Sequence, residues 1–278
     1  IYLTHGNDVL LPEGFKPTPA STYRNYRRDQ LLPCEWNRVM FNKGVKPPAG
    51  HVIRTDQDGE RWDMIAGGFR NPYGLAFNPD GELFVYDADM EWDEGSPWYR
   101  PTRVNHVVSG GDYGWRQGTD KWPAYFPDSL PGNADIGLGS PTAIAFGNGS
   151  NFPEPYRRAL FILDWAYGKI IAVHLIPEGA SYRGQAEEFV TGRPLNVTGV
   201  DFGPDGAMYF VTGGRRTQSA LYRVTWAGGD IAEKAPAQAG KDAAKLRELR
   251  KRLEAFHGRR DSKAVTAAFK HLGHRDRF

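Results

Sequence analysis

The fold is decided by one stretch of the chain, residues 68–85, which reads GFRNPYGLAFNPDGELFV. It contains an Arg-Asn-Pro corner, a short apolar strand, a Pro-Asp-Gly turn and a second strand. The turn and the second strand recur at residues 202–211, which read FGPDGAMYFV. Repeated units of strand, Asp-Gly turn and strand are typical of β-propeller blades. The sequence therefore predicts an all-β fold built as a propeller.

Strand patterns continue on both sides of this stretch and predict a partial propeller over residues 1–226. A turn at Asp58-Gly59 predicts a hairpin over residues 51–65. Three further groups of strands open at Gly74, Thr142 and Gly199, and we expect these opening strands to lie innermost because small residues suit the crowded axis. Together they make three to four blades, whereas propellers close with about four to eight. The strands are expected at 74–77, 83–87 and 104–109, at 142–146, 159–164, 169–176 and 188–190, and at 199–202, 208–212 and 220–226.

The composition changes after residue 226. Residues 227–240 are rich in Ala, Gly and Pro and are expected to form a linker, and residues 241–278 are expected to form two amphipathic helices that begin an α-solenoid. Asp261 and Ser262 predict the cap of the second helix. The basic run at 247–252 is typical of nucleic-acid binding or, more often, of a solvated helix face, and we favour the solvated face. The apolar positions are Leu246, Leu249, Leu253 and Phe256, and then Val265, Phe269 and Leu272.

Composition also narrows the class of function. The 278 residues carry 35 Lys and Arg against 33 Asp and Glu, and a net charge of +2 gives no general attraction to nucleic acid or to a membrane surface. The longest apolar runs, such as residues 159–163, are too short to span a bilayer. Cys34 is the only cysteine, which excludes an internal disulfide and a cysteine-pair motif for haem or zinc.

The Arg-Asn-Pro corner at residues 70–72 resembles that of the glucose/sorbosone dehydrogenase family, six-bladed propellers that use pyrroloquinoline quinone. The chain is more closely similar to the propeller segment of large bacterial proteins classed as membrane-bound dehydrogenases. In those proteins the propeller precedes HEAT-type helical repeats and a haem-binding domain. The matching strings are CEWNR at 34–38, YDADMEWD at 86–93, PWYRPTR at 97–103, KWP at 121–123, DWAYGK at 164–169 and TGGRR at 212–216.

The resemblance implies that Arg70 and Asn71 contact the cofactor, because they match an Arg-Asn pair that does so in the family. A guanidinium and an amide suit the carboxylates and quinone oxygens of a planar acidic cofactor. The alternative is that Arg70 pairs with a core carboxylate while Asn71 caps the turn before Pro72.

The chain also departs from the family pattern. An Arg-x-Arg-Asp element that clamps the cofactor in the family is reduced at residues 198–201 to its Asp, and Ala166 stands near the place of an expected lysine. Neighbouring cations are candidates to replace them, namely Lys169, Arg215 and Arg216. The family's catalytic histidine would precede Ile1, and His5, which follows the first strand, does not match it.

Two segments predict a calcium site. Residues 110–115 read GGDYGW and resemble a family segment whose backbone oxygens help to bind calcium, so Asp112 and Tyr113 are candidate ligands. The alternative is an ordinary turn anchored by Trp115. The second segment is an acidic cluster whose oxygen ligands favour calcium, unless Arg100 and Arg103 neutralise it by salt bridges. Its four carboxylates are Asp87, Asp89, Glu91 and Asp93.

The resemblance implies a periplasmic or cell-envelope oxidoreductase of bacterial type. The leading expectation is a quinone-dependent oxidation of a sugar or other polyol, in which a histidine removes the hydroxyl proton and electrons leave through a haem-binding domain. The alternative is a non-catalytic propeller that binds a carbohydrate or a protein partner on its face. Fold alone does not choose between them.

Overall fold

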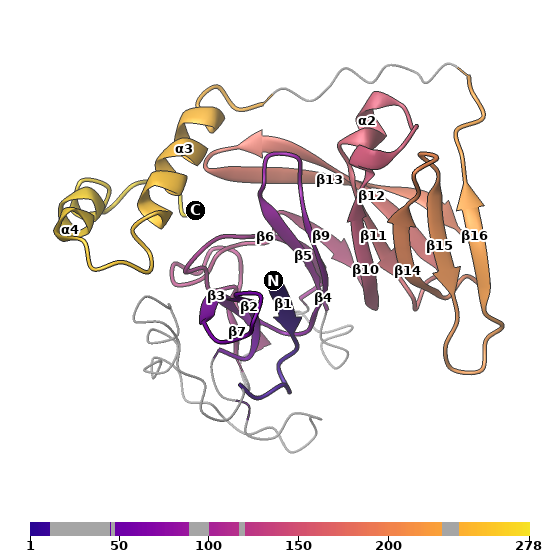
Figure 1. The fold of residues 1–278 in the computed structure, drawn as a ribbon, viewed down its shortest axis with the longest axis horizontal. Coiled ribbons are helices and arrows are strands. Elements are labelled where there is room, and N and C mark those ends of the chain that lie inside the picture. The colour runs from indigo at the N-terminus through magenta and orange to yellow at the C-terminus, as the bar shows by residue number, and fades with distance from the viewer. Residues whose placement is uncertain (12–44, 46–47, 89–99, 117–119, 230–238) are drawn as a thin grey trace.

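The fold is known from a computed structural model, which describes residues 1–11, 45, 48–88, 100–116, 120–229 and 239–278. Strands dominate these residues and form four antiparallel sheets that follow one another like blades (Figure 1). The predicted all-β propeller fold is confirmed. The first sheet contains β1 (Tyr2–His5), β2 (Gly50–Thr55) and β3 (Trp62–Phe69), and the second contains β4 (Pro72–Phe77), β5 (Leu83–Asp87), β6 (Thr102–Val107) and β9 (Ala134–Gly137). The third contains β10 (Pro141–Phe146), β11 (Leu160–Asp164), β12 (Lys169–Glu178) and β13 (Ser181–Thr191), and the fourth contains β14 (Val197–Phe202), β15 (Met208–Thr212) and β16 (Ala220–Val224).

The opening strands of the last three sheets, β4, β10 and β14, lie at the inner edges and contact one another in sequence, as predicted. They run in the same direction. The Thr142 hydroxyl at the start of β10 donates a 2.8 Å hydrogen bond to the carbonyl of Val197 at the start of β14. Gly74 of β4 lies against Ile144 of β10 with a φ of +78°, so a side chain there would be strained and crowded. We call the face where these three strands begin the strand-start face, and the opposite one the strand-end face.

The Pro-Asp-Gly turns lie on the strand-end face and form for a local reason. The Asn78 side chain accepts hydrogen bonds from the backbone N–H groups of Asp80 at 3.0 Å and Glu82 at 2.9 Å. Gly81 then adopts a φ of +74°, and Gly206 adopts the same φ in the repeat. The turn is therefore determined by neighbouring residues in the sequence. For this reason its repetition predicts the blades.

Apolar cores hold adjacent sheets face to face, and two of them join the second, third and fourth sheets. Burying one large apolar side chain contributes about 1.5–3 kcal/mol, so each core outweighs the individual polar contacts between sheets. The core between the second and third sheets includes Phe84, Tyr86, Val104, Phe146, Ile162 and Val173. The core between the third and fourth sheets includes Phe152, Phe161, Leu163, Ile170, Met208 and Phe210.

The C-terminal helices also form where the sequence predicts them. They are α3 (Ala243–Glu254) and α4 (Ser262–Phe269), and the Asp261 side chain caps α4 by accepting from the N–H of Lys263 at 2.8 Å. The predicted linker at 227–240 lies largely outside the described residues. None of the described segments forms a helix that is long and apolar enough to cross a membrane.

The interpretation of the basic run as a solvated helix face is wrong for Arg250. Its side chain is only 6% exposed, and its Nη2 lies 2.7 Å from Glu82 Oε1 on the strand-end face. Its Nε donates to the Ala180 carbonyl at 3.0 Å, and Lys251 Nζ lies 3.0 Å from Glu82 as well. The reason is that Glu82 is itself buried by the sheets and needs a cation. The helix α3 therefore docks on the propeller through this charged side.

Further strands that the sequence did not predict complete the outer parts of the sheets. The strand β9 adds a fourth strand to the second sheet, and β13 begins at Ser181, well before the predicted 188–190. A small separate sheet joins β7 (Trp115–Arg116) to β8 (Asp120–Lys121). The strand β8 of this small sheet contains Lys121, which lies beneath the strand-start face.

Candidate functional site

The Arg70–Asn71 corner connects β3 to the innermost strand β4 on the strand-start face. The Asp87 carboxylate at the end of β5 accepts hydrogen bonds from both backbone N–H groups, from Arg70 at 3.2 Å and from Asn71 at 2.8 Å. Both residues are half-buried. Pro72 follows with its fixed φ and starts the strand. The corner is thus held through its backbone at the entrance to the central axis.

The charge of Asp87 is balanced by Lys121 of β8. The two charged groups lie 3.4 Å apart, and both side chains are fully buried. The Lys121 ammonium also donates to the carbonyls of Ala88 and Pro101. Sequence reasoning expected Arg100 or Arg103 in this place if no metal bound, and missed Lys121. Asp87 therefore has protein partners for both of its oxygens.

Asp164 repeats this arrangement in the third sheet. It ends β11 as Asp87 ends β5, and its carboxylate accepts from the N–H groups of Ser140 at 2.9 Å and Ala166 at 3.0 Å. Burial raises the pKa of Asp164 more than these hydrogen bonds lower it. The signal is visible in the sequence as LFVYD at 83–87 and LFILD at 160–164. Because Asp164 belongs to no acidic cluster, the repeat indicates that Asp87 has a structural role.

A pair of histidines lies beside the corner. Gly6 follows β1, and a side chain there would collide with the Asn71 amide. His5 Nδ1 lies 2.9 Å from His51 Nε2, and His51 Nδ1 lies 2.8 Å from the Ala49 carbonyl.

The hydrogen bonds of this pair fix its protons. Burial lowers the pKa of both rings, that of His51 to about 4, so both are neutral near pH 7. Because a carbonyl only accepts, the proton of His51 is on Nδ1, and His5 must donate its Nδ1 proton to His51 Nε2. His5 Nε2 is then left as a proton acceptor. Sequence reasoning missed this pair because the two residues are 46 positions apart.

The other candidate cations occupy different positions. Lys169 at the start of β12 forms an ion pair with Glu188 of the outer strand β13. Arg215 lies over the Trp165 ring at 5.3 Å, in the loop after β15 on the strand-start face. Arg215 and Arg216 are exposed and have φ values of +47° and +70°, which are uncommon for residues with side chains. Strained backbone of this kind is often found at functional sites.

The glycine-rich segment at 110–115 is engaged within the protein. The carbonyls of Gly111 and Asp112 accept from the N–H groups of Gly67 and Leu130. The Tyr113 carbonyl accepts from the buried Arg103 guanidinium.

The side chains of the two residues predicted to bind calcium through this segment have partners too. The Asp112 carboxylate pairs with Arg116 at 2.5 Å. The Tyr113 hydroxyl donates to the His106 carbonyl, and burial raises its pKa. This segment has the contacts of a structural turn. The remaining predicted ligands, Asp89, Glu91 and Asp93, lie outside the described residues. Among the residues that the structure describes, no cluster of His, Cys, Asp or Glu suits a metal ion.

A second buried polar network lies near the strand-end face. His106 Nε2 lies 3.0 Å from Glu82, and His106 Nδ1 lies 2.9 Å from the Ser181 hydroxyl. Burial alone would raise the pKa of Glu82, but His106 and Arg250 outweigh it and lower the value to about 2. Serine, histidine and glutamate are the residue types of a hydrolase triad. Ser181 is buried, however, and accepts from the Asn133 amide at 2.9 Å, so the network has a structural role.

Comparison with known proteins gives similar structures and no family assignment. No family model and no curated protein matches the chain. A protein described as an oxidoreductase (glucose dehydrogenase) from Thermus thermophilus is 25% identical over 58% of this chain and 47% of its own, with a TM-score of 0.47. The aldose sugar dehydrogenase from Streptomyces coelicolor, in its form bound to pyrroloquinoline quinone, is 15% identical over 62% of this chain and 51% of its own, with a TM-score of 0.48.

The soluble aldose sugar dehydrogenase from Escherichia coli is also similar, at 20% identity over 58% of this chain and 51% of its own, with a TM-score of 0.46. These structures are sugar dehydrogenases, the class that the sequence resembles. The chain spans about half the length of each of them. With TM-scores below 0.5 they add no argument about individual residues, and the proposal that follows depends on the chain's own geometry.

Proposed function

We propose that this propeller belongs to a quinone-dependent dehydrogenase that oxidises a sugar or another polyol, with pyrroloquinoline quinone bound on the strand-start face at Arg70 and Asn71. The observation that supports it most is the corner itself. Buried Asp87 fixes the backbone of both residues at the entrance of β4, while Lys121 balances the charge of Asp87. The corner thus joins a guanidinium and a carboxamide, which suit carboxylate and carbonyl oxygens.

The donor set of this face fits an acidic quinone. Arg215 and Arg216 add two exposed guanidinium groups from the loop after β15, and Arg70 would hold a carboxylate of the cofactor while Asn71 donates to a carbonyl oxygen. When bound, the quinone accepts the hydride from the carbinol carbon. The neutral His5 is an imidazole near this face whose Nε2 can accept a proton.

Calcium at residues 111–113 stays a prediction from the sequence, and the contacts of this segment favour the alternative of a structural turn. The three backbone carbonyls there accept hydrogen bonds from protein donors, and Asp112 pairs with Arg116. We therefore assign no step to a metal ion at this segment. Calcium at Asp89, Glu91 and Asp93 stays a prediction from the sequence, as do the periplasmic or cell-envelope location, the HEAT-type repeat and the haem-binding partner domain.

A second candidate function is a non-catalytic propeller that binds a carbohydrate or protein partner. Two observations favour it. Lys169, a candidate to replace the family's missing lysine, is already paired with Glu188 on an outer strand. The cofactor clamp is also reduced at residues 198–201, where Asp201 accepts the N–H of the adjacent Phe202. The experiment below separates the two candidates.

The test is titration of the protein with pyrroloquinoline quinone, followed by absorbance and calorimetry and then by dye reduction with a panel of sugars. We expect saturable binding, and we expect Arg70→Ala to weaken it by about 1.5–3 kcal/mol, the value of a charge-assisted hydrogen bond. Arg183→Ala, an exposed arginine on β13, is the matched control and should leave the affinity unchanged. Absence of quinone binding would favour the second candidate.

A further inference from the structure

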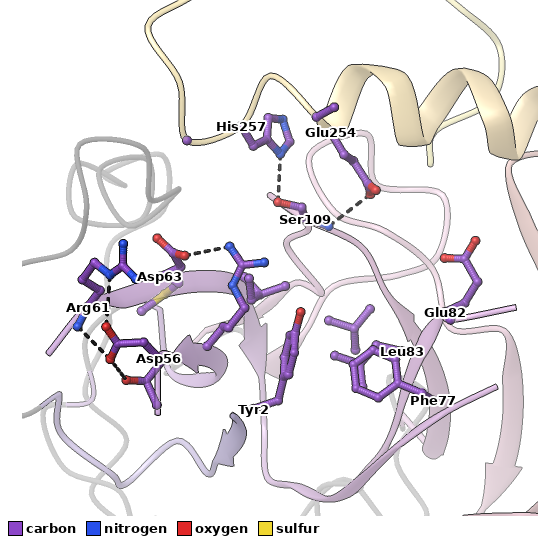
Figure 2. Close-up of a pocket in the computed structure, with 18 of the residues that line it drawn as sticks. Tyr2, Asp56, Arg61, Asp63, Phe77, Glu82, Leu83, Ser109, Glu254 and His257 are labelled. Carbon is purple, nitrogen blue, oxygen red and sulfur yellow. Dashed lines mark hydrogen bonds and ion pairs between the residues drawn. The ribbon is translucent and has the colours of Figure 1, made fainter. Parts of the chain in front are cut away.

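A cleft of about 820 Å³ lies on the strand-end face, away from the Arg70–Asn71 corner. It is bordered by the first sheet, by the turn between β4 and β5, and by the C-terminal end of α3 with the loop that follows (Figure 2). Sites for small molecules usually have volumes of about 300–1,000 Å³. The cleft therefore has the size of a ligand site, and neither the proposed function nor the sequence motifs account for it.

The floor of the cleft is aromatic. The rings of Tyr2 and Phe77 meet edge to face with their centroids 5.1 Å apart. Phe77 is 41% exposed although it ends the innermost strand β4, and Leu83 lies beside it (Figure 2). An exposed aromatic ring at the base of a cleft offers a flat apolar surface on which a ring-shaped ligand can stack.

The walls of the cleft carry paired charges. Arg54 lies 2.7 Å from Asp63, and Arg61 lies 3.0 Å from Asp56. Both pairs come from the β2–β3 hairpin and are partly exposed. Each pair presents N–H donors and carboxylate acceptors side by side, so one ligand hydroxyl group can donate to the acid and accept from the arginine.

The opposite wall comes from the C-terminal segment. The His257 imidazole lies 2.9 Å from the Ser109 hydroxyl, and Glu254 accepts from the N–H of Ser109 at 3.2 Å (Figure 2). Glu254 also pairs with Arg250 at 3.0 Å. These contacts hold the loop after α3 over the cleft. The wall therefore depends on the docking of α3.

The charges that line the cleft balance. Four guanidinium groups face four carboxylates, and of these eight lining groups only Arg259 forms no ion pair with a described residue. At the two hairpin pairs an anionic ligand would have to compete with the aspartates for their arginines, which leaves only the exposed Arg259 to attract it, and a cationic ligand would meet four arginines. The lining groups are Arg54, Arg61, Arg250 and Arg259, with Asp56, Asp63, Glu82 and Glu254.

From this geometry we propose that the cleft binds an uncharged saccharide. One face of the sugar ring stacks on Phe77, and its hydroxyl groups bridge the Arg54–Asp63 and Arg61–Asp56 pairs without separating them. The site lies on the opposite face from the proposed quinone site and needs no cofactor. It is thus independent of the proposed dehydrogenase activity and can be tested without it, and it gives the second candidate function, carbohydrate binding, a specific site.

Isothermal titration calorimetry of the protein without cofactor tests the proposal. The probes are the neutral trisaccharides maltotriose, cellotriose, xylotriose and mannotriose, with glucuronic acid and glucosamine as charged comparisons. We expect at least one neutral trisaccharide to bind with a dissociation constant in the millimolar range or below. Arg61→Ala should weaken that binding by about tenfold, as expected for loss of one charge-assisted hydrogen bond. Because the Arg61 side chain is 79% exposed, this variant should fold normally.

Matched controls come from the fourth sheet. Arg223→Ala removes another partly exposed Arg–Asp pair, and Tyr222→Ala removes an aromatic ring exposed like Phe77, and neither lies at the cleft. Phe77→Ala removes the ring on which the sugar stacks and should weaken trisaccharide binding. Both controls should bind the trisaccharide like the unaltered protein. Absence of binding by all four trisaccharides would overturn the proposal, as would equal losses in Arg61→Ala and Arg223→Ala. Tight binding of only the charged sugars would overturn the assignment to an uncharged ligand.

Discussion

At the scale of single residues, Asp87 and Asp164 show how one short pattern fixes the entrance to an inner strand. Each ends the second strand of its sheet and accepts backbone N–H groups from the segment that begins the innermost strand. Hydrogen bonds to an ionised carboxylate are roughly twice as strong as neutral ones. Asp87 also meets a buried lysine. Its stabilising contribution therefore depends on its charge.

Replacing this charge gives the first test. Asp87→Asn keeps the size of the side chain but leaves the Lys121 ammonium buried without its counter-charge, so we expect the free energy of unfolding to fall by about 3–5 kcal/mol. Chemical denaturation measures it. Asp205→Asn is the control, because Asp205 pairs with Arg223 at the surface, where solvent screens the pair, so this variant should lose much less stability than Asp87→Asn. Similar small losses in both variants would show that the Asp87–Lys121 pair adds little.

The buried histidines predict how stability depends on pH. Burial lowers the pKa of His51 to about 4, and burial also lowers the pKa of His106. As the solution is acidified, these histidines therefore take up protons in the unfolded chain at a higher pH than in the folded protein. Stability should be greatest above about pH 6.5 and should fall below it, by about 3 kcal/mol for His51 once the pH reaches 4. Unfolding by urea at several pH values measures this. His51→Gln should flatten the curve, and a curve that rises on acidification would contradict the argument.

Glu82 affects stability at lower pH than the histidines and in the same direction. Its folded pKa of about 2 lies below the ordinary value of 4.5, so its stabilising contribution is present above pH 4.5 and is lost as the pH falls toward 2. Its partners His106 and Arg250 come from two different elements. Acid should therefore loosen β6 and α3 together. The measurement is protection of their amides from hydrogen exchange, and loosening of only one of them would contradict this.

At the scale of elements, the sequence predicts what local chemistry controls. The Pro-Asp-Gly turns, the opening strands and the cap at Asp261 all depend on neighbours within a few residues, and all lie where they were predicted. The long-range partners could not be predicted in this way. His5 meets His51 across 46 positions, and Arg250 meets Glu82 across 168. Because burial decides which charges must pair, a basic run in a helix does not reveal by itself which arginine docks.

The docking of α3 is testable through Arg250. Arg250→Met should lower the free energy of unfolding by about 3 kcal/mol, because Glu82 stays buried while its closest cation is lost. Arg252→Met is the matched control on the same helix, with an exposed side chain 3.9 Å from Glu248, and should change stability by less than about 0.5 kcal/mol. Thermal and chemical unfolding give both values. Equal effects would mean that the helix is held by its apolar contacts alone.

At the scale of the whole molecule, the two faces of the propeller are built separately. The strand-start face carries the Arg70–Asn71 corner and the His5–His51 pair, and the strand-end face carries the turns on which α3 docks. The strand β5 joins them, with Glu82 just before its first residue and Asp87 at its last. At about 3.3 Å per residue, these two carboxylates lie on the order of 15 Å apart. A separation of this size predicts that the faces respond independently.

The double variant Asp87→Asn with Arg250→Met tests that independence. Substitutions more than about 7–10 Å apart without shared partners usually add within about 0.5 kcal/mol, and the ion-pair partners of Asp87 and Arg250 are different residues. We therefore expect the loss in unfolding free energy of the double variant to equal the sum of the two single losses within that margin. Chemical denaturation of the four proteins at one pH gives the comparison. A larger coupling would show that β5 transmits strain between the faces, and a ligand on one face would then be expected to alter binding on the other.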